Sequence, residues 1–160
     1  MENEEKSILI KTYSIVFLQQ LPEVRGYRNR AFAFMTLYEY AVNARKLAHA
    51  PFSKFRVGAA IEYEDGRVFT GCNIENASYG LTMCAERVAV FKAVSEGAGK
   101  AIAVMVVADT QTLTPPCGAC RQLLWEFCGE AELTMANLAG KRECVSIREI
   151  FPRPFDASFL

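Results

Sequence analysis

The run from Ala101 to Ala108 limits the possible folds more than any other stretch of this sequence. It reads Ala-Ile-Ala-Val-Met-Val-Val-Ala, so a strand formed by it would be apolar on both faces. Such a strand is typical of the centre of a sheet that helices cover on both sides. The sequence therefore predicts an α/β fold with this run as a central strand.

The neighbouring segments alternate between helix-like and strand-like patterns. Asp65-Gly66 predicts a hairpin between two strands, and Gly97 predicts the end of a helix. Ser146 with Glu149 predicts a capping box at the start of a short helix. The predicted helices are 31–48, 82–96 and 118–127, and the predicted strands are 56–63, 68–74, 101–108 and 132–138. We expect a single domain over residues 1–160. Residues 1–30 form an amino-terminal extension, and the apolar segment 8–21 fits a helix or a strand.

The charge balance argues against a nucleic-acid partner. Lys plus Arg total 18 and Asp plus Glu total 18, so the formal net charge is zero and no basic tract is present. No apolar run has the length of a membrane span, and the start Met1 to Lys6 is acidic where a secretory signal would be basic. We therefore expect a cytoplasmic protein that acts on a small molecule and binds neither nucleic acid nor membrane.

Three of the six cysteines lie where predicted helices begin, namely Cys84, Cys117 and Cys120. Helix starts carry unpaired amides and the positive end of the helix dipole, which favour the thiolate form that binds zinc. Three protein ligands leave one zinc position open, which is the catalytic pattern. We assign the remaining thiols to the core (Cys72, Cys128 and Cys144) and interpret His49, the only histidine, as structural.

An acidic residue stands two positions after the first predicted ligand. Cys84-Ala85-Glu86 followed by Pro116-Cys117-Gly118-Ala119-Cys120 fits the zinc deaminases, in which a glutamate that is not a ligand moves protons between water and base. A third sulfur adds negative charge and would weaken the zinc ion as an acid. Arg87 is a candidate to offset that charge by hydrogen bonding to a ligand sulfur.

Four longer stretches resemble the small homotetrameric cytidine deaminases. They are APFSKFRVGAA at 50–60, TGCNIENASY at 70–79, CAER at 84–87 and PCGACRQ at 116–122, in the family's order. The similarity extends over roughly residues 36 to 155. It implies a three-layer α/β/α sandwich with a mixed central sheet of about five strands, and one Zn2+ per subunit of a homotetramer.

The resemblance also assigns roles to individual residues. Glu86 is implied as the proton carrier in hydrolysis of cytidine and deoxycytidine to uridine and deoxyuridine, with release of ammonia, in pyrimidine salvage. Asn73 and Glu75 are implied to bind the ribose hydroxyls and Phe52 to pack on the base. The other implied substrate contacts are Ala85 within the site and Ala77, Tyr79 and Phe155, which reach across subunits. Phe52 stands where a tyrosine is common, and Pro115 where a small polar residue is usual.

Two other functions remain open at this stage. One is deamination of a related substrate such as an aminonucleoside antibiotic, a nucleotide or a polynucleotide. The other is a protein without this activity, in which Cys117 and Cys120 hold a structural zinc ion or cycle as a disulfide. Substrate comparison separates the first alternative, and metal analysis together with a disulfide reductase assay separates the second.

Overall fold

The computed structural model describes the backbone of residues 30–160 and the side chains of residues 37–160. Residues 34–160 form one compact unit. Its elements are α2 (Arg30–Lys46, which begins before the unit), β1 (Val57–Tyr63), β2 (Val68–Cys72), η1 (Tyr79–Leu81), α3 (Ala85–Ser95), β3 (Ala101–Ala108), α4 (Gly118–Cys128), β4 (Glu132–Asn137), β5 (Arg142–Ser146), α5 (Ile147–Ile150) and η2 (Ala157–Phe159). The expectations for segment 8–21 and for a single domain over 1–160 involve residues outside this described part and stay predictions.

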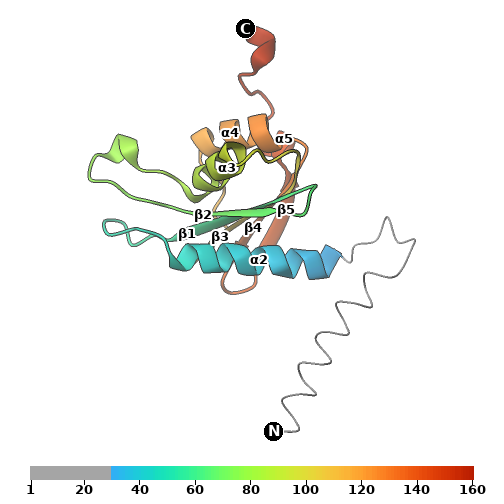
Figure 1. Cartoon of the computed structure of the whole chain (residues 1–160). Coiled ribbons are helices and arrows are strands. Elements are labelled where there is room, and N and C mark those ends of the chain that lie inside the picture. Colours follow the sequence, from blue (N-terminus) through green and yellow to red (C-terminus); the bar gives the residue numbers. More distant parts are fainter. Residues whose placement is uncertain (1–29) are drawn as a thin grey trace, which may run out of the picture. The chain divides into compact units, whose positions relative to one another are not determined.

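The five strands form one sheet in the order β2-β1-β3-β4-β5. Only β3 and β4 are parallel to each other, and the other neighbours are antiparallel, so the sheet is mixed. Helix α2 lies on one face, and α3, α4 and α5 lie on the other (Figure 1). The expected three-layer α/β/α sandwich is confirmed.

The central strand β3 contributes side chains to two separate cores. Val104 and Val106 are buried in the core shared with α3, α4 and α5, whereas Met105 and Val107 are buried against α2 on the opposite face. All four side chains are at most 2% exposed. The apolar character of both faces of this run therefore has the predicted cause, which is a helix layer on each side.

Two glycines allow helices to approach the sheet closely. A Cβ on Gly58 would lie 2.0 Å from the carbonyl oxygen of Ala41 in α2. A Cβ on Gly71 would lie 2.3 Å from the carbonyl oxygen of Ala85 in α3. Because these neighbours are helix backbone atoms, no side-chain rotation could make room. Gly71 thus sets how close the first turn of α3 lies to β2.

Several strands begin or end side by side, at the same end of the sheet. Ala108 at the end of β3 pairs with Asn137 at the end of β4 and with Val57 at the start of β1. Gly58 pairs with Cys72 at the end of β2. The segments that precede β1 and follow β2 and β3 therefore leave the sheet at the same end, although they are far apart in sequence.

The predicted helices and strands agree with the structure to within a few residues, but one strand and the two short 3-10 helices η1 and η2 were not predicted. Strand β5 was not predicted, and it is an edge strand with mostly exposed residues. The assignment of Cys144 to the core is wrong, because this residue lies exposed on β5, while Cys128 is buried and Cys72 is half-buried. The hairpin turn and the helix end contain the expected glycines in the left-handed region, Gly66 at φ 84° and Gly97 at φ 67°. None of the described helices has the length and apolar character needed to cross a membrane.

Candidate metal centre

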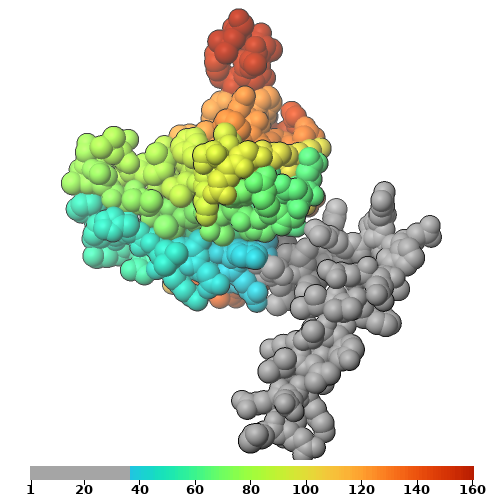
Figure 2. Space-filling model, viewed as in Figure 1, coloured from blue at the N-terminus to red at the C-terminus, as the bar shows by residue number. Residues whose placement is uncertain are grey.

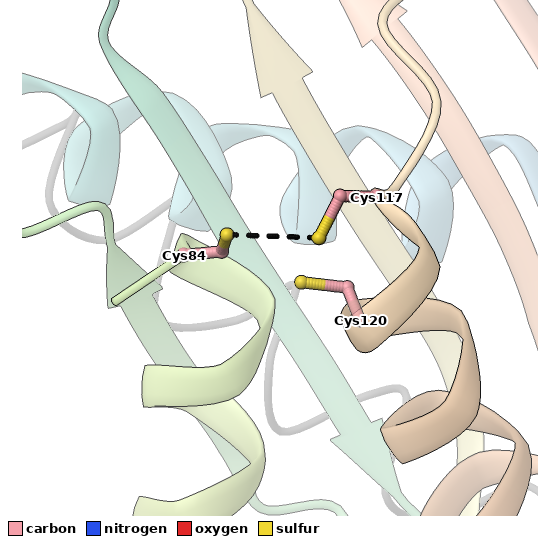
Figure 3. Close-up of side chains that lie close together, drawn as sticks. All are labelled: Cys84, Cys117 and Cys120. Atoms are coloured by element: carbon pink, nitrogen blue, oxygen red, sulfur yellow. Dashed lines mark hydrogen bonds between the residues drawn. The ribbon is translucent and has the colours of Figure 1, made fainter. Parts of the chain in front are cut away.

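The side chains of Cys84, Cys117 and Cys120 converge on one point. All three sulfur atoms lie within 4.8 Å of one another, and the Sγ atoms of Cys84 and Cys117 are 3.9 Å apart. The sulfurs come from the starts of two neighbouring helices and face each other across the gap between them (Figure 3). The predicted three-cysteine cluster is therefore assembled by the fold.

The local structure of both helix starts leaves the thiols available to a metal. Cys84 is the N-cap residue of α3 and Cys117 is the N-cap residue of α4, both in extended conformation, and neither side chain makes a capping hydrogen bond. Cys120 lies in the first turn of α4, where the spacing from N-cap to third helical residue turns both side chains toward the helix start. The first-turn amides and the helix dipoles favour negative charge at this position.

The spacing and chemistry of the cluster fit a zinc ion. Tetrahedral coordination with Zn–S bonds of about 2.3 Å requires sulfur atoms about 3.8 Å apart. The Cys84–Cys117 separation of 3.9 Å is close to that requirement. Within residues 37–160, no further histidine, cysteine or carboxylate joins the three sulfurs as a ligand group.

The three thiols and Arg87 form one electrostatic unit. The pKa of the Cys84 thiol is lowered, first by its hydrogen bond with Cys120 and then by the Arg87 guanidinium, despite partial burial. The hydrogen bond with Cys84 and burial raise the pKa of Cys120, so this thiol keeps its proton. Arg87 Nη2 lies 3.5 Å from Cys84 Sγ and donates to the carbonyl oxygen of Thr82 at 3.0 Å. Negative charge thus develops first on Cys84, next to a fixed cation.

A second donor of Arg87 has no acceptor. Its Nε is buried without a hydrogen-bond partner, the one such side-chain nitrogen or oxygen in the part of the chain described here. A buried unpaired donor costs free energy unless a group binds to it. Arg87 therefore has capacity for a further acceptor when the sulfurs become thiolates.

Glu86 follows the N-cap cysteine of α3 by two positions and is 4% exposed. Burial raises the pKa of this carboxyl group, and the neighbouring Cys84 acts in the same direction, while the residue's own backbone amide, Cys120 and Arg87 oppose the shift. A carboxyl group with a raised pKa can hold and release a proton closer to neutral pH than an exposed glutamate.

Asn73, Glu75 and Phe52 form a second cluster around the loop that precedes β1. Asn73 Oδ1 accepts from the Val57 amide at 2.8 Å, and its Nδ2 donates to the Phe55 carbonyl oxygen at 2.8 Å. Glu75 Oε2 accepts from the Phe52 amide at 2.9 Å. The two residues expected to bind ribose therefore also hold the loop that carries Phe52, whose ring is exposed.

Backbone bridges join this second cluster to the sulfur cluster. Ile74 pairs with His49 on one side and with Met83 on the other. Both Ile74–Met83 hydrogen bonds are 2.9 Å long, and Met83 directly precedes Cys84. Segment 73–75 thus lies between the loop that carries Phe52 and Cys84, and the backbone of His49 takes part in this pairing.

The remaining predicted residues lie in other surroundings. Ala85 is fully buried at the start of α3. Ala77 is exposed on the segment that leads into η1, and Tyr79, which is 83% exposed, is the first residue of η1, which projects from the sheet (Figure 1). Phe155 is also exposed, in the C-terminal segment that projects in the space-filling view (Figure 2). Within the described chain these three side chains are not gathered at the sulfur cluster.

Two residues that the sequence analysis did not single out hold predicted site residues in place. Gln122 on α4 accepts from the Phe155 amide and donates to its carbonyl oxygen, with the latter bond 2.7 Å long. Ser53 hydrogen-bonds to Glu75. Both lie inside the motif stretches, but a serine or glutamine in a loop or on a helix surface carries no signal of its long-range partner.

Comparison with known proteins matches residues 34–136 to the family described as the cytidine and deoxycytidylate deaminase zinc-binding region. A cytidine deaminase from Halalkalibacterium halodurans is 49% identical over 122 residues, which cover 76% of this chain and 92% of that protein. A cytidine deaminase from Sporosarcina psychrophila is 50% identical over 113 residues, covering 70% and 83%. The crystal structure of cytidine deaminase from Burkholderia pseudomallei superposes with a TM-score of 0.72 at 44% identity, covering 76% and 98%.

Replacing Arg87 with alanine is expected to raise the pKa of the Cys84 thiol in zinc-free protein, because the thiolate loses a donor and a nearby positive charge. The wild-type pKa is lowered, so the thiolate forms at a lower pH than in an ordinary cysteine. The pH midpoint of alkylation at Cys84, followed by mass spectrometry, should therefore move upward in Arg87→Ala.

Arg121→Ala is the matched control for that measurement. Arg121 donates to the carbonyl oxygens of Pro116 and Ile150 near the start of α4, and no contact with a sulfur accompanies these bonds in the described structure. Its removal should leave the Cys84 midpoint near the wild-type value. An unchanged midpoint in Arg87→Ala would show that the guanidinium does not stabilise this thiolate.

Proposed function

The chain belongs to the cytidine deaminase family, and we propose that it hydrolyses both cytidine and deoxycytidine to the corresponding uridines with release of ammonia, as a step in pyrimidine salvage. The observation that carries this proposal is a buried glutamate beside three converging sulfurs. Glu86 is 4% exposed and stands two residues after Cys84 in the first turn of α3. A proton carrier with a raised pKa next to a zinc-binding cluster is what hydrolytic deamination requires.

Each side chain near the cluster has a proposed task. Cys84, Cys117 and Cys120 would hold one Zn2+ per subunit, and the ion would supply the positive charge that makes a water molecule acidic. As the oxygen of that water adds to the carbon that bears the amine, Glu86 would take the water's proton and deliver it to the pyrimidine ring nitrogen. Glu86 would then pass the proton of the new hydroxyl group to the amine, which leaves as ammonia while the carbonyl group forms. The raised pKa of Glu86 supports both halves of this transfer, because the group must accept and then release the proton.

Arg87 is proposed to limit the negative charge of the site. Three thiolates around a divalent cation leave a net charge of about minus one, which weakens the ion's effect on bound water. The 3.5 Å contact between Arg87 Nη2 and Cys84 Sγ supports partial withdrawal of that charge. Arg87 is therefore a positioning residue that acts through a ligand and not on the substrate.

The nucleoside is proposed to bind between the two clusters. Glu75 and Asn73 would bind the sugar hydroxyls, Phe52 would pack on the base, and Ala85 would line the site at the start of α3. Asn73 uses one of its two acceptor sites and one of its two donor hydrogens on the loop, so its amide has capacity for one hydroxyl group. The exposed ring of Phe52 is free to stack on a flat base.

Ala77, Tyr79 and Phe155 are proposed to complete the site of a neighbouring subunit in a homotetramer. The support is large exposed apolar side chains on two projecting segments, with Tyr79 83% exposed and Phe155 stacked on Phe159 at 5.5 Å. Sedimentation equilibrium should then give a mass of four chains, and a monomer mass at enzyme-assay concentrations would contradict this arrangement.

Three thiolate ligands need reduced cysteines, which supports a cytoplasmic location that cell fractionation would test.

Purified protein is expected to contain one zinc ion per chain and to deaminate cytidine and deoxycytidine, because both nucleosides offer a sugar hydroxyl to Glu75. Cytidine monophosphate should be a much poorer substrate, since the balanced charge provides no phosphate-binding cluster. Metal analysis and the ultraviolet absorbance change measure both expectations. The proposed substrate range would be contradicted if kcat/KM for cytidine monophosphate equalled that for cytidine. It would also be contradicted if the absorbance did not change with deoxycytidine.

Glu86→Gln should keep the zinc ion and the fold but lower kcat by about a hundred- to ten-thousand-fold, because the amide cannot carry the proton. The control is Glu96→Gln, which changes an acid at the other end of the same helix. Zinc content, thermal midpoint and kcat are compared for both variants. A near-normal kcat in Glu86→Gln would remove this residue from proton transfer.

A further inference from the structure

The loop of residues 51–55 depends on a side chain that has no assigned role, Ser53. Its amide donates to Glu75 Oε2 at 3.2 Å, and its hydroxyl hydrogen-bonds to Glu75 Oε1. The same hydroxyl oxygen accepts from the Phe55 amide at 3.0 Å. Ser53 therefore links two points of its own loop to a carboxylate on segment 73–75.

The direction of each hydrogen bond in this network can be deduced. The Phe55 amide can only donate, so it occupies a lone pair of Ser53 Oγ and leaves the hydroxyl hydrogen for another partner. Glu75 has a pKa below its usual range, chiefly because the Ser53 hydroxyl donates to it, so the carboxylate is ionised and can only accept. The chain of donors thus runs from Phe55 through Ser53 to Glu75.

Counting acceptor sites on Glu75 leaves one open position. Oε2 accepts from the amides of Phe52 and Ser53, which uses both of its lone-pair directions. Among the residues described, Oε1 accepts only from the Ser53 hydroxyl, which leaves one lone-pair direction. A ligand group at that position must be a donor without negative charge, which fits a sugar hydroxyl and excludes a phosphate.

The loop conformation itself needs to be held. Lys54 has a φ of 61°, in the left-handed region that is unfavourable for a residue with a Cβ. Lys54 Nζ donates to the Pro51 carbonyl oxygen at 2.7 Å, and the Lys54 amide donates to the Ala50 carbonyl oxygen at 3.2 Å. The bonds from Ser53 to Glu75 help to offset this backbone cost and keep Phe52 and Glu75 in fixed relation.

We propose that Ser53 is a positioning residue for sugar recognition: its hydroxyl fixes the Glu75 carboxylate so that the open acceptor site on Oε1 meets a hydroxyl of the nucleoside sugar. This inference rests on the proposed binding of the sugar by Glu75. Ser53 does not itself touch the substrate. Without its hydroxyl, the two amide bonds to Oε2 still hold the loop, but Oε1 is free to bind water or turn away.

The test compares two substrates on one enzyme preparation. Ser53→Ala should lower kcat/KM for cytidine about tenfold more than kcat/KM for 2′,3′-dideoxycytidine, which has no ring hydroxyl for Oε1. The ratio of the two values is the readout, because the fraction of folded, zinc-loaded enzyme cancels from it. The loss for cytidine should appear mainly in KM, since the chemical step at Glu86 is untouched.

Three variants serve as comparisons. Ser53→Thr keeps a hydroxyl and should restore most of the wild-type ratio. Ser53→Cys keeps the volume but donates weakly, so it should behave like alanine, and it replaces Ser53→Ala if that variant is not recovered folded. Ser95→Ala removes a serine hydroxyl that bonds to Lys92 on the exposed side of α3, and should leave the ratio unchanged.

The outcomes separate this inference from the proposed function. If wild-type enzyme discriminates between the two substrates and Ser53→Ala discriminates equally well or better, the role of Ser53 is refuted while the role of Glu75 stands. If wild-type enzyme shows no discrimination, sugar binding by Glu75 fails and this inference fails with it. A reduced ratio in Ser53→Ala that Ser53→Thr restores supports the assignment.

Discussion

The close packing of two helix starts on one face of the sheet is the constraint on which the rest of the site depends. The N-cap residues of α3 and α4 bring Cys84 and Cys117 to a separation of 3.9 Å, with Cys120 one turn into α4. Gly71 lets the first turn of α3 lie against β2, and Leu124 and Cys128 of α4 share a core with Ala89 and Val90 of α3. Because two dipoles and unpaired amides meet there, the fold prepares a place for thiolates before any metal binds.

The same helix start positions Glu86, the proposed proton carrier. Glu86 and Arg87 follow Cys84 by two and three positions, so the first turn of α3 with its N-cap supplies a sulfur, a buried carboxyl group and a guanidinium. The pKa values of two groups in this turn are shifted in opposite directions. Burial raises the pKa of Glu86, whereas hydrogen bonds with Cys120 and Arg87 lower the pKa of Cys84. A short peptide with this order of residues would lack both the burial that raises the pKa of Glu86 and the hydrogen bond with Cys120 that lowers the pKa of Cys84, because both need α3 to be packed beside α4.

The substrate side of the site has a different construction, in which loops are joined to each other. Ile74 forms bridges to His49 and Met83, and the side chains of Asn73 and Glu75 hold the loop that carries Phe52. Segment 73–75 therefore connects the three-cysteine cluster to the loop of Phe52, the residue proposed to stack on the base. A change at Glu75 is expected to act on loop geometry as well as on sugar binding, so its effects cannot be read as loss of one contact.

The sequence by itself determined the α/β class, most helix and strand positions and the three cysteines that the fold brings together, Cys84, Cys117 and Cys120, because periodicity, turn residues and helix-start motifs act over about a dozen residues. The role of Glu86 stays a prediction. It did not reveal β5, an exposed edge strand without an apolar pattern, and it wrongly assigned Cys144, which lies on that strand, to the core. Only the tertiary structure decided that Ser53 meets Glu75, 22 residues away, and that Gln122 holds Phe155, 33 residues away. Such pairs depend on the order of strands in the sheet and on the end at which the loops leave it, and no local pattern encodes either.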